Sequence, residues 1–206
     1  MKVINNVDET LKEDLEREIK KGSKLSIAAA SFSIYAYDQL KKELEGIDQL
    51  RFLFTSPSFL KEKPKKEKRE FQILRKERER NLYGSPFEVK LRNEMTQKAI
   101  AKECADWIRR KVTFKSNITD EVMPGFMNLD DINYAPMTSF TTVDLGIERG
   151  NNAYFMIQKS EAPFSTSYIA LFDELWKDKE KLQEVTDEVI ESITTVYNEN
   201  SPEYLY

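Results

Sequence analysis

Apolar residues near the start of the chain follow two different periods. Leu11, Leu15 and Ile19 recur every four residues, which is the spacing of a helix with one buried face. The run KLSIAAASF that follows is typical of a buried strand. We expect Asp8 to cap this helix and Gly22 to end it. The predicted elements of this part are a helix over residues 8–21, a strand over 24–32, a helix over 35–45 and a strand over 50–56.

The strand, helix and second strand lie within about 30 residues, which predicts a crossover that joins two parallel strands. The pattern beyond residue 88 predicts helices at both ends of a strand-rich stretch. It gives a helix over 88–111, short strand-like segments at 112–118, 122–129, 134–143 and 152–158, and helices within 163–198.

Histidine is absent from the whole chain, which excludes the chemistry that depends on imidazole. Ser-His and Cys-His triads, imidazole bases, His-ligated zinc and histidine phosphoryl transfer all need that side chain. The six glycines form neither a GxGxxG motif nor a Walker A motif, so no phosphate-cradling loop is predicted. We therefore expect no catalysis, no bound metal and no cofactor in this chain.

Two further features have a simple structural interpretation. Cys104 is the single cysteine, which excludes an internal disulfide, and its place in the 88–111 helix is typical of a small buried residue rather than a reactive thiol. Asp130-Asp131 follows a predicted strand and is the one acidic pair placed where metal-dependent chemistry is plausible. A turn is the expected role of this pair, because aspartate is a common turn residue.

Charge is concentrated in one stretch, residues 61–80. It contains ten Lys/Arg and five Glu, so it carries +5, and the rest of the chain must carry −9 because the total is −4. Phe59, Phe71, Tyr83 and Phe87 lie in or beside it, and such aromatic residues stack on bases while cations contact phosphates. A solvated surface whose Glu and Lys pair with one another stays an alternative. The candidate nucleic-acid-binding residues are Lys61, Lys63, Lys65, Lys66, Lys68, Arg69, Arg75, Lys76, Arg78 and Arg80.

Several segments resemble known domains. Residues 24–56 resemble the opening of phospholipase-D-like nuclease domains, which begin with a strand, a helix and a strand. Residues 104–117, 136–152 and 172–206 are similar, more closely, to the N-terminal phospholipase-D-like domain of bacterial Swi/Snf-type DEAD/DEAH helicases. The resemblance implies an α/β fold, a phospholipase-D-like mixed sheet flanked by helices. It also implies a degenerate domain over 1–162 and a C-terminal helical extension, 163–206, that leads toward a helicase domain using ATP and Mg.

The catalytic signature of phospholipase-D-like enzymes is H-x-K-x-x-x-x-D, in which His attacks phosphorus and Lys balances charge. Thr113-Phe114-Lys115 with Asp120 has the spacing, but Thr replaces His. The preferred placement is Pro124-Gly125-Phe126, which has lost both His and Lys, and the next predicted strand keeps Phe140-Thr141. The residues assigned to the degenerate active-site region are Thr113, Lys115, Asp120, Pro124, Phe126, Thr138, Ser139 and Thr141.

Three functions are open at this point. The first, implied by the resemblance, is a non-catalytic accessory domain that recognises DNA or positions a helicase motor on it, with the helicase domain in the same protein. The second is a protein–protein module, for example a homodimer, built on a dead phospholipase-D-like fold. The third is an enzyme with lysine and carboxylate chemistry, for which Lys115 and Asp120 or Asp130 are the candidates.

The sequence also gives an expected location. No apolar run approaches the ~20 residues needed to span a bilayer. The N-terminus lacks the apolar region of a signal peptide. We therefore expect a cytoplasmic protein without a membrane partner.

Overall fold

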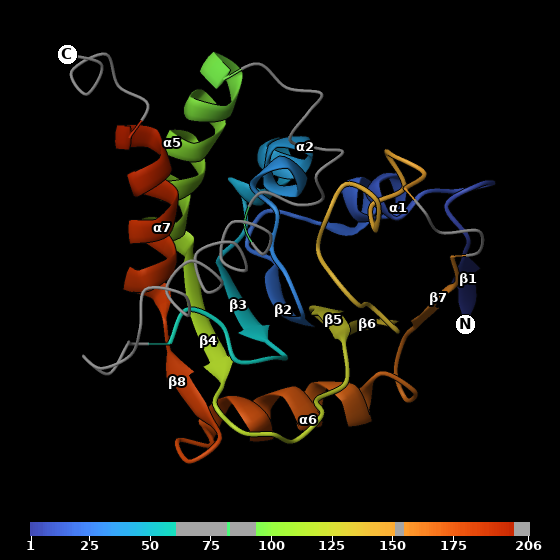
Figure 1. The fold of residues 1–206 in the computed structure, drawn as a ribbon. Helices are drawn as coiled ribbons and strands as arrows, with labels where there is room; N and C mark the ends of the chain where they lie inside the picture. The colour runs from blue at the N-terminus through green and yellow to red at the C-terminus, as the bar shows by residue number, and fades with distance from the viewer. Residues whose placement is uncertain (61–81, 83–93, 151–154, 200–206) are drawn as a thin grey trace.

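The computed structural model describes residues 1–60, 82, 94–150 and 155–199, and in this part of the chain an eight-stranded mixed sheet is flanked by helices (Figure 1). The predicted α/β class with a mixed sheet is therefore confirmed. The strands are β1 (Lys2–Ile4), β2 (Lys24–Ala29), β3 (Gln49–Phe54), β4 (Val112–Asn117), β5 (Phe126–Leu129), β6 (Ile132–Ala135), β7 (Ile157–Ser160) and β8 (Leu182–Glu184). The helices are α1 (Leu11–Glu18), α2 (Ile34–Leu44), α5 (Glu94–Lys111), α6 (Thr166–Lys177) and α7 (Thr186–Glu199).

The strand order is β1-β7-β6-β5-β2-β3-β4-β8. Strands β2, β3 and β4 are parallel, and the remaining pairs are antiparallel. Leu25 lies opposite Leu50, and Phe52 lies opposite Phe114. The predicted crossover from β2 through α2 to β3 is confirmed.

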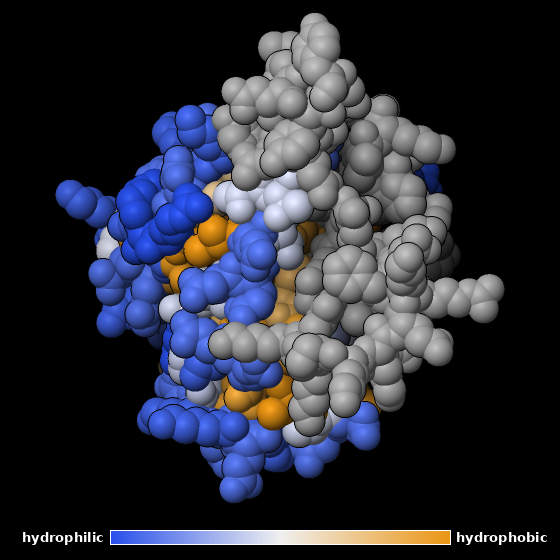
Figure 2. Space-filling view, turned by 60° about the vertical axis from the view of Figure 1, so that its left-hand side comes forward, coloured by the Kyte–Doolittle hydropathy of each residue, from blue (hydrophilic) through white to orange (hydrophobic). Residues whose placement is uncertain are grey.

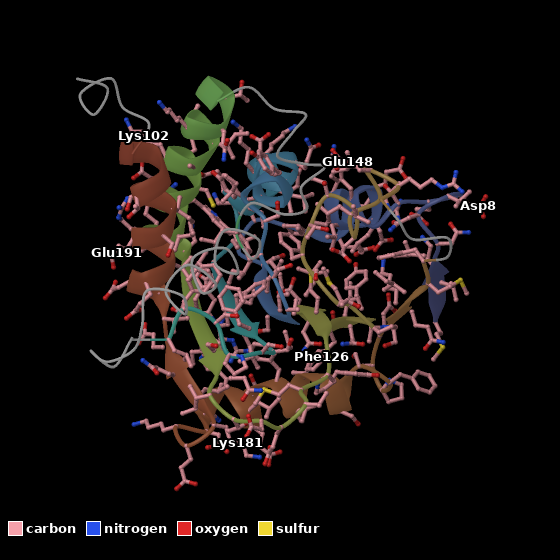
Figure 3. All side chains as sticks on the ribbon, viewed as in Figure 1. Asp8, Lys102, Phe126, Glu148, Lys181 and Glu191 are labelled. Carbon is pink, nitrogen blue, oxygen red and sulfur yellow. The ribbon has the colours of Figure 1, made fainter. Side chains whose placement is uncertain are left out.

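Helices cover the two faces of the sheet unequally (Figure 1). The main core lies between one face and α1, α2, α5 and α7, where Phe32, Phe52 and Phe114 are fully buried and their ring centroids lie 5.3–5.5 Å apart. Because side chains alternate along a strand, the intervening residues face α6 on the other side. Phe126 packs there against Phe172 of α6. Figure 3 shows Phe126 beside α6.

The start of α1 differs from the prediction. Thr10, not Asp8, is the N-cap: its hydroxyl accepts from the Glu13 backbone N–H (3.2 Å), and the Glu13 carboxylate accepts from the Thr10 N–H (2.9 Å). This is a capping box. Asp8 instead lies in the preceding turn and accepts from the Asn5 amide at 2.8 Å. The predicted cap at Asp8 is wrong because Asp8 lies two residues too early to reach the free N–H groups of the helix.

Replacing Thr10 with alanine is expected to lower the free energy of unfolding by about 1 kcal/mol, since one orphan N–H of α1 loses its acceptor. Chemical denaturation monitored by circular dichroism measures this loss. Asp8→Ala is the matched control, and it should stay within about 0.5 kcal/mol of the native chain. Equal losses for the two variants would contradict the assignment of Thr10 as the cap.

The second half of the chain departs from the predicted elements in several places. Residues 163–198 do contain helices, α6 and α7, but strand β8 lies between them and pairs with β4, with Leu182 opposite Asn117. The strand predicted over 134–143 ends at Ala135. In addition, α5 matches the described part of the 88–111 helix, whereas 88–93 lie outside the described residues.

Candidate functional site: the carboxyl edge of the parallel strands

The loops that follow the three parallel strands meet at one edge of the sheet, called here the carboxyl edge. It comprises residues 30–33, 55–58, 118–125 and 136–140, because the antiparallel β5 begins and β6 ends at the same edge. In open α/β sheets, ligands bind outside the carboxyl ends of the strands. This edge is therefore the candidate ligand-binding surface of the fold.

Backbone hydrogen bonds hold two of these loops side by side. The Ala30 N–H donates to the Thr138 carbonyl (2.8 Å), and the Phe140 N–H donates to the Ser31 carbonyl (2.9 Å). The Met137 N–H donates to the Gly125 carbonyl (2.9 Å), which joins the lead into β5 to the same assembly. Residues 136–140 thus continue the sheet as a partner of the β2–α2 loop, which is why they form no regular strand with β5.

The other two loops are joined through side chains at the ends of β3 and β4. The Ser58 N–H donates to the Ser116 hydroxyl (2.8 Å). The Asn117 amide donates to the carbonyls of Thr55 and Glu121, at 2.9 Å each. Ser116 and Asn117 are buried, so these bonds form in a setting where an unpaired polar group is costly. The edge is therefore a fixed surface rather than four independent loops.

Several neutral hydroxyl groups lie on this surface, beside exposed apolar residues such as Val122. They belong to Ser31, Thr55, Ser56, Thr138 and Ser139, each partly or fully exposed, and within the described ranges none of these hydroxyls has a hydrogen-bond partner. Serine and threonine hydroxyls commonly contact phosphate oxygens of nucleic acids. The charged side chains of the described edge are Asp120 and Glu121, on its outer loop.

The N-terminus of α2 points at this edge but is not available to a ligand. Ser33 and Ile34 are fully buried, and the Ser33 hydroxyl already accepts from the Tyr35 N–H at 3.1 Å. The helix therefore supplies no open anion site, although helix N-termini often do.

Two residues that flank the basic stretch in the sequence belong to the main core beside this edge. Phe59 and Leu82 are both buried in the main core, and the Phe59 ring lies 5.2 Å from that of Phe54 at the end of β3. The ten predicted nucleic-acid-binding residues, from Lys61 to Arg80, lie between Phe59 and Leu82 in the sequence and outside the described residues.

The structure separates the residues assigned to the degenerate active site. Pro124, Thr138 and Ser139 lie on the carboxyl edge, whereas Phe126 is buried against α6. Thr141 lies in the next turn, where its hydroxyl donates to the Asp144 carboxylate at 2.6 Å.

The first sequence placement, with Thr113, Lys115 and Asp120, does not form a cluster. Thr113 and Lys115 are on β4, and the Lys115 ammonium donates to the Trp176 carbonyl of α6 at 2.8 Å. Asp120 is exposed on the carboxyl edge. Among the described residues, no hydrogen bond or ion pair links Lys115 to Asp120 or Asp130.

A charged cluster beneath α6 was not predicted from the sequence. The Arg51 guanidinium on β3 bonds the Ser26 hydroxyl and the Asp173 carboxylate, both at 2.8 Å. Trp176 lies between two cations, with the Arg51 guanidinium 5.8 Å and the Lys115 ammonium 4.5 Å from its ring centroid. Burial lowers the pKa of Lys115, more than Glu184 raises it. The cluster fixes α6 on the sheet, and its one sequence signal was an arginine inside the apolar strand LRFLF.

A second unpredicted cluster surrounds Asp14 of α1, which is fully buried. Its carboxylate accepts from the Tyr134 hydroxyl (2.7 Å), the Lys159 ammonium (3.0 Å) and the Arg17 guanidinium (2.6 Å). Lys159 also pairs with Glu18 at 2.8 Å. Burial pushes the pKa of Asp14 up, but the hydrogen bonds from Tyr134 and Lys159 outweigh it and hold the pKa below its ordinary value. Every member has a partner, so the cluster joins α1 to β6 and β7 rather than offering a site.

The structure confirms the simple interpretations of two other residues. Cys104 is fully buried in α5, and burial raises the pKa of its thiol well above the ordinary value. Asp130 lies in the turn between β5 and β6, and its carboxylate accepts from the Lys24 N–H at 2.9 Å. No group of three or more acidic or cysteine side chains that could hold a metal ion occurs within the described ranges.

Comparison with known proteins adds no family to these observations. The chain matches none of the protein-family models and none of the curated proteins with which it was compared. The resemblance to Swi/Snf-type helicases therefore stays a prediction based on the quoted segments. Across the part of the chain that the structure describes, every helix is too short or too polar to cross a membrane.

Proposed function

We propose that this chain is a non-catalytic accessory domain that binds nucleic acid, in the first instance DNA, through the basic stretch 61–80. The observation that carries the proposal is the separation of charge along the chain. A stretch of +5 lies in the sequence between two core residues, Phe59 and Leu82, and the remainder of the chain carries −9.

The acidic remainder supports a binding surface confined to this stretch. Helix α7 contains no lysine or arginine, and Asp187 and Glu191 are exposed on it. Figure 2 turns the side of the molecule that carries α7 forward, and its coloured surface is hydrophilic around a hydrophobic area near the centre. The exposed carboxylates of α7 repel phosphate, so a polyanion is steered toward the basic stretch.

The hydroxyl groups of the carboxyl edge support the same assignment. They lie beside Phe59, where the basic stretch begins, and they can donate to phosphate oxygens without adding charge. Cations then supply the affinity, and the hydroxyls fix the position of the backbone. Neither contact reads a base, so we expect little sequence preference.

The larger setting of this function comes from the resemblance alone. A domain at the N-terminus of a Swi/Snf-type helicase would place the motor, which uses ATP and Mg, on its DNA. The chain itself lacks the histidine nucleophile that phospholipase-D-like chemistry requires. The competing function, a protein–protein module, has separate support in the exposed edge strand β1.

The test is a comparison of DNA affinity across a salt series for the native chain and for a triple variant, Lys65→Gln, Lys66→Gln and Lys68→Gln. On double-stranded DNA, each lost phosphate contact removes about 0.9 from the slope of log K against log salt, so the triple variant should lose up to about 3. Labelled single- and double-stranded DNA of several sequences should weaken alike.

Lys20→Gln, Lys21→Gln and Lys24→Gln form the matched control. They change the net charge by the same amount, but they lie at or just before the start of β2, at the opposite edge of the sheet. The control should keep the native slope. Equal slopes for the two triple variants, or no binding of the native chain at low salt, would refute the proposed function.

A further inference from the structure

The two outer strands of the sheet, β1 and β8, present different edges. Beside β8, Glu180, Lys181 and Glu184 place charges of both signs along the edge, which is a common protection against pairing with another strand. The single charged residue of β1 is Lys2. Its ammonium group is paired with Glu9 and with Asp14 (3.4 Å), so its charge is already neutralised.

The α6 side of β1 is apolar and exposed. Side chains alternate along a strand, so Met1 and Val3 share this side, and the pairing of Val3 with Gln158 places Met156 of the neighbouring segment on it as well. These three residues are 77%, 48% and 62% exposed. The cluster beneath α6 contains residues of β2, β3, β5, β6 and β8 but none of β1 or β7. Figure 1 agrees, since β1 and β7 lie beyond the end of α6.

We propose that β1 pairs with β1 of a second copy of this chain, in antiparallel orientation about a two-fold axis at Val3. Strand length selects this register among those that keep equivalent faces together. An axis at Lys2 or at Ile4 would pair only that one residue of β1 with β1 of the second copy. An axis at Val3 sets Lys2 opposite Ile4 and pairs all three residues of the strand.

A second copy would also cover the apolar side of β1. With the axis at Val3, the two valines contact each other across the interface, and Met1 and Met156 of both copies lie around them. The same patch serves both partners, as an isologous interface requires. The two sheets join into one continuous sheet without a free β1 edge, and nucleic acid has no part in the contact.

The experiment uses two variants at the two-fold axis, Val3→Lys and Val3→Glu, with mass measured by sedimentation velocity. The native chain is expected to dimerise. Each variant alone places like charges opposite each other and should weaken the dimer at least about tenfold. An equimolar mixture of the two variants should recover the dimer, because Lys then lies opposite Glu.

Val122→Lys is the matched control, since Val122 is 96% exposed on the carboxyl edge, far along the sheet from β1. It should dimerise like the native chain. Circular dichroism should show that all variants keep the fold, because the Val3 side chain is half exposed. A native chain that is monomeric up to about 1 mM would overturn the proposal and leave β1 to a strand of an unlike protein. A dimer equally intact in Val3→Lys and Val122→Lys, or a mixture that stays monomeric, would also overturn it.

Discussion

Replacing Asp14 with asparagine is expected to lower the free energy of unfolding by about 3 kcal/mol. The carboxylate is fully buried and accepts from Tyr134, Lys159 and Arg17. An amide offers one acceptor oxygen, and its NH₂ group would face donors. Removing one partner from a buried ion pair costs about 3–5 kcal/mol. We expect the lower end of this range, because Glu18 still pairs with Lys159 at 2.8 Å.

Chemical denaturation at neutral pH measures this loss, and Asp131→Asn is its control. Asp131 is exposed at the β5–β6 turn, so its substitution should change stability by no more than about 0.5 kcal/mol. A loss below about 1 kcal/mol for Asp14→Asn would show that the buried cluster contributes little net stability, as some buried ion pairs do.

The pH profile of the same two chains gives a second measure. The pKa of Asp14 in the folded protein lies below its ordinary value of about 4. The stabilisation is therefore complete above that ordinary value and disappears as pH falls through the lower folded pKa. The difference between native chain and Asp14→Asn should be constant at neutral pH and narrow on acidification below about pH 4. A difference that is the same at pH 3 and pH 7 would speak against an ionised Asp14.

The Asp14 cluster also connects the stability of the fold to its proposed interface. Lys2 of β1 and Lys159 of β7 both contact Asp14, so two neighbouring strands direct their lysines toward α1. A lysine at a sheet edge ordinarily discourages pairing with another strand. Here the Asp14 carboxylate, which stabilises the core, also neutralises the charge of Lys2 at the edge. The apolar side of β1 is then the surface that contacts a partner.

Local patterns sufficed for the parallel half of the fold. The alternation of a buried strand, an amphipathic helix and a second buried strand in residues 24–56 is complete within one short stretch, so β2, α2 and β3 followed from it. The burial of Cys104 followed in the same way from its place on a helix face. In such segments each residue's role depends on neighbours a few positions away.

Contacts between distant segments could not be predicted. Lys159 reaches Asp14 across 145 residues, and Arg51 reaches Asp173 across 122 residues. Strand β8 has only three residues between two helices, too few for a periodic signal, and it exists because β4 offers it an edge. A charged residue inside an apolar strand, such as Arg51, indicates from the sequence that a partner exists, but it does not indicate which residue the partner is.

The candidate site was predicted in part. Charge alone indicated residues 61–80, which lie outside the described residues and stay a prediction. The resemblance placed Thr138 and Ser139 in one region, and the structure brings both to the carboxyl edge. The resemblance could not supply Ser31 or Ser56. These residues lie in the loops after β2 and β3, which come close to residues 136–140 only in the folded sheet. Lys115 and Phe126, assigned to the same region, point toward α6 instead.

Replacing Gly125 with alanine is expected to lower the free energy of unfolding by about 3 kcal/mol, the upper part of the range for overpacking. A Cβ at this position would lie 2.1 Å from the Met137 carbonyl oxygen and 3.0 Å from its carbon. The Met137 N–H bonds the Gly125 carbonyl at 2.9 Å, and the Thr138 carbonyl accepts from Ala30. The obstacle is backbone fixed at both ends, so it cannot rotate away as a side chain would.

Gly46→Ala is the matched control, because a Cβ there meets its nearest atom, the Glu43 carbonyl oxygen, at an ordinary 3.6 Å. Its free energy of unfolding should be unchanged or raised by up to about 1 kcal/mol, because alanine lowers the conformational entropy of the unfolded chain. Chemical denaturation of the two variants separates a clash from a general effect of losing glycine. If Gly125→Ala unfolded at the same denaturant concentration as Gly46→Ala, residues 136–140 would have to be free to move off β5. The carboxyl edge would then not be the fixed surface that its hydrogen bonds indicate.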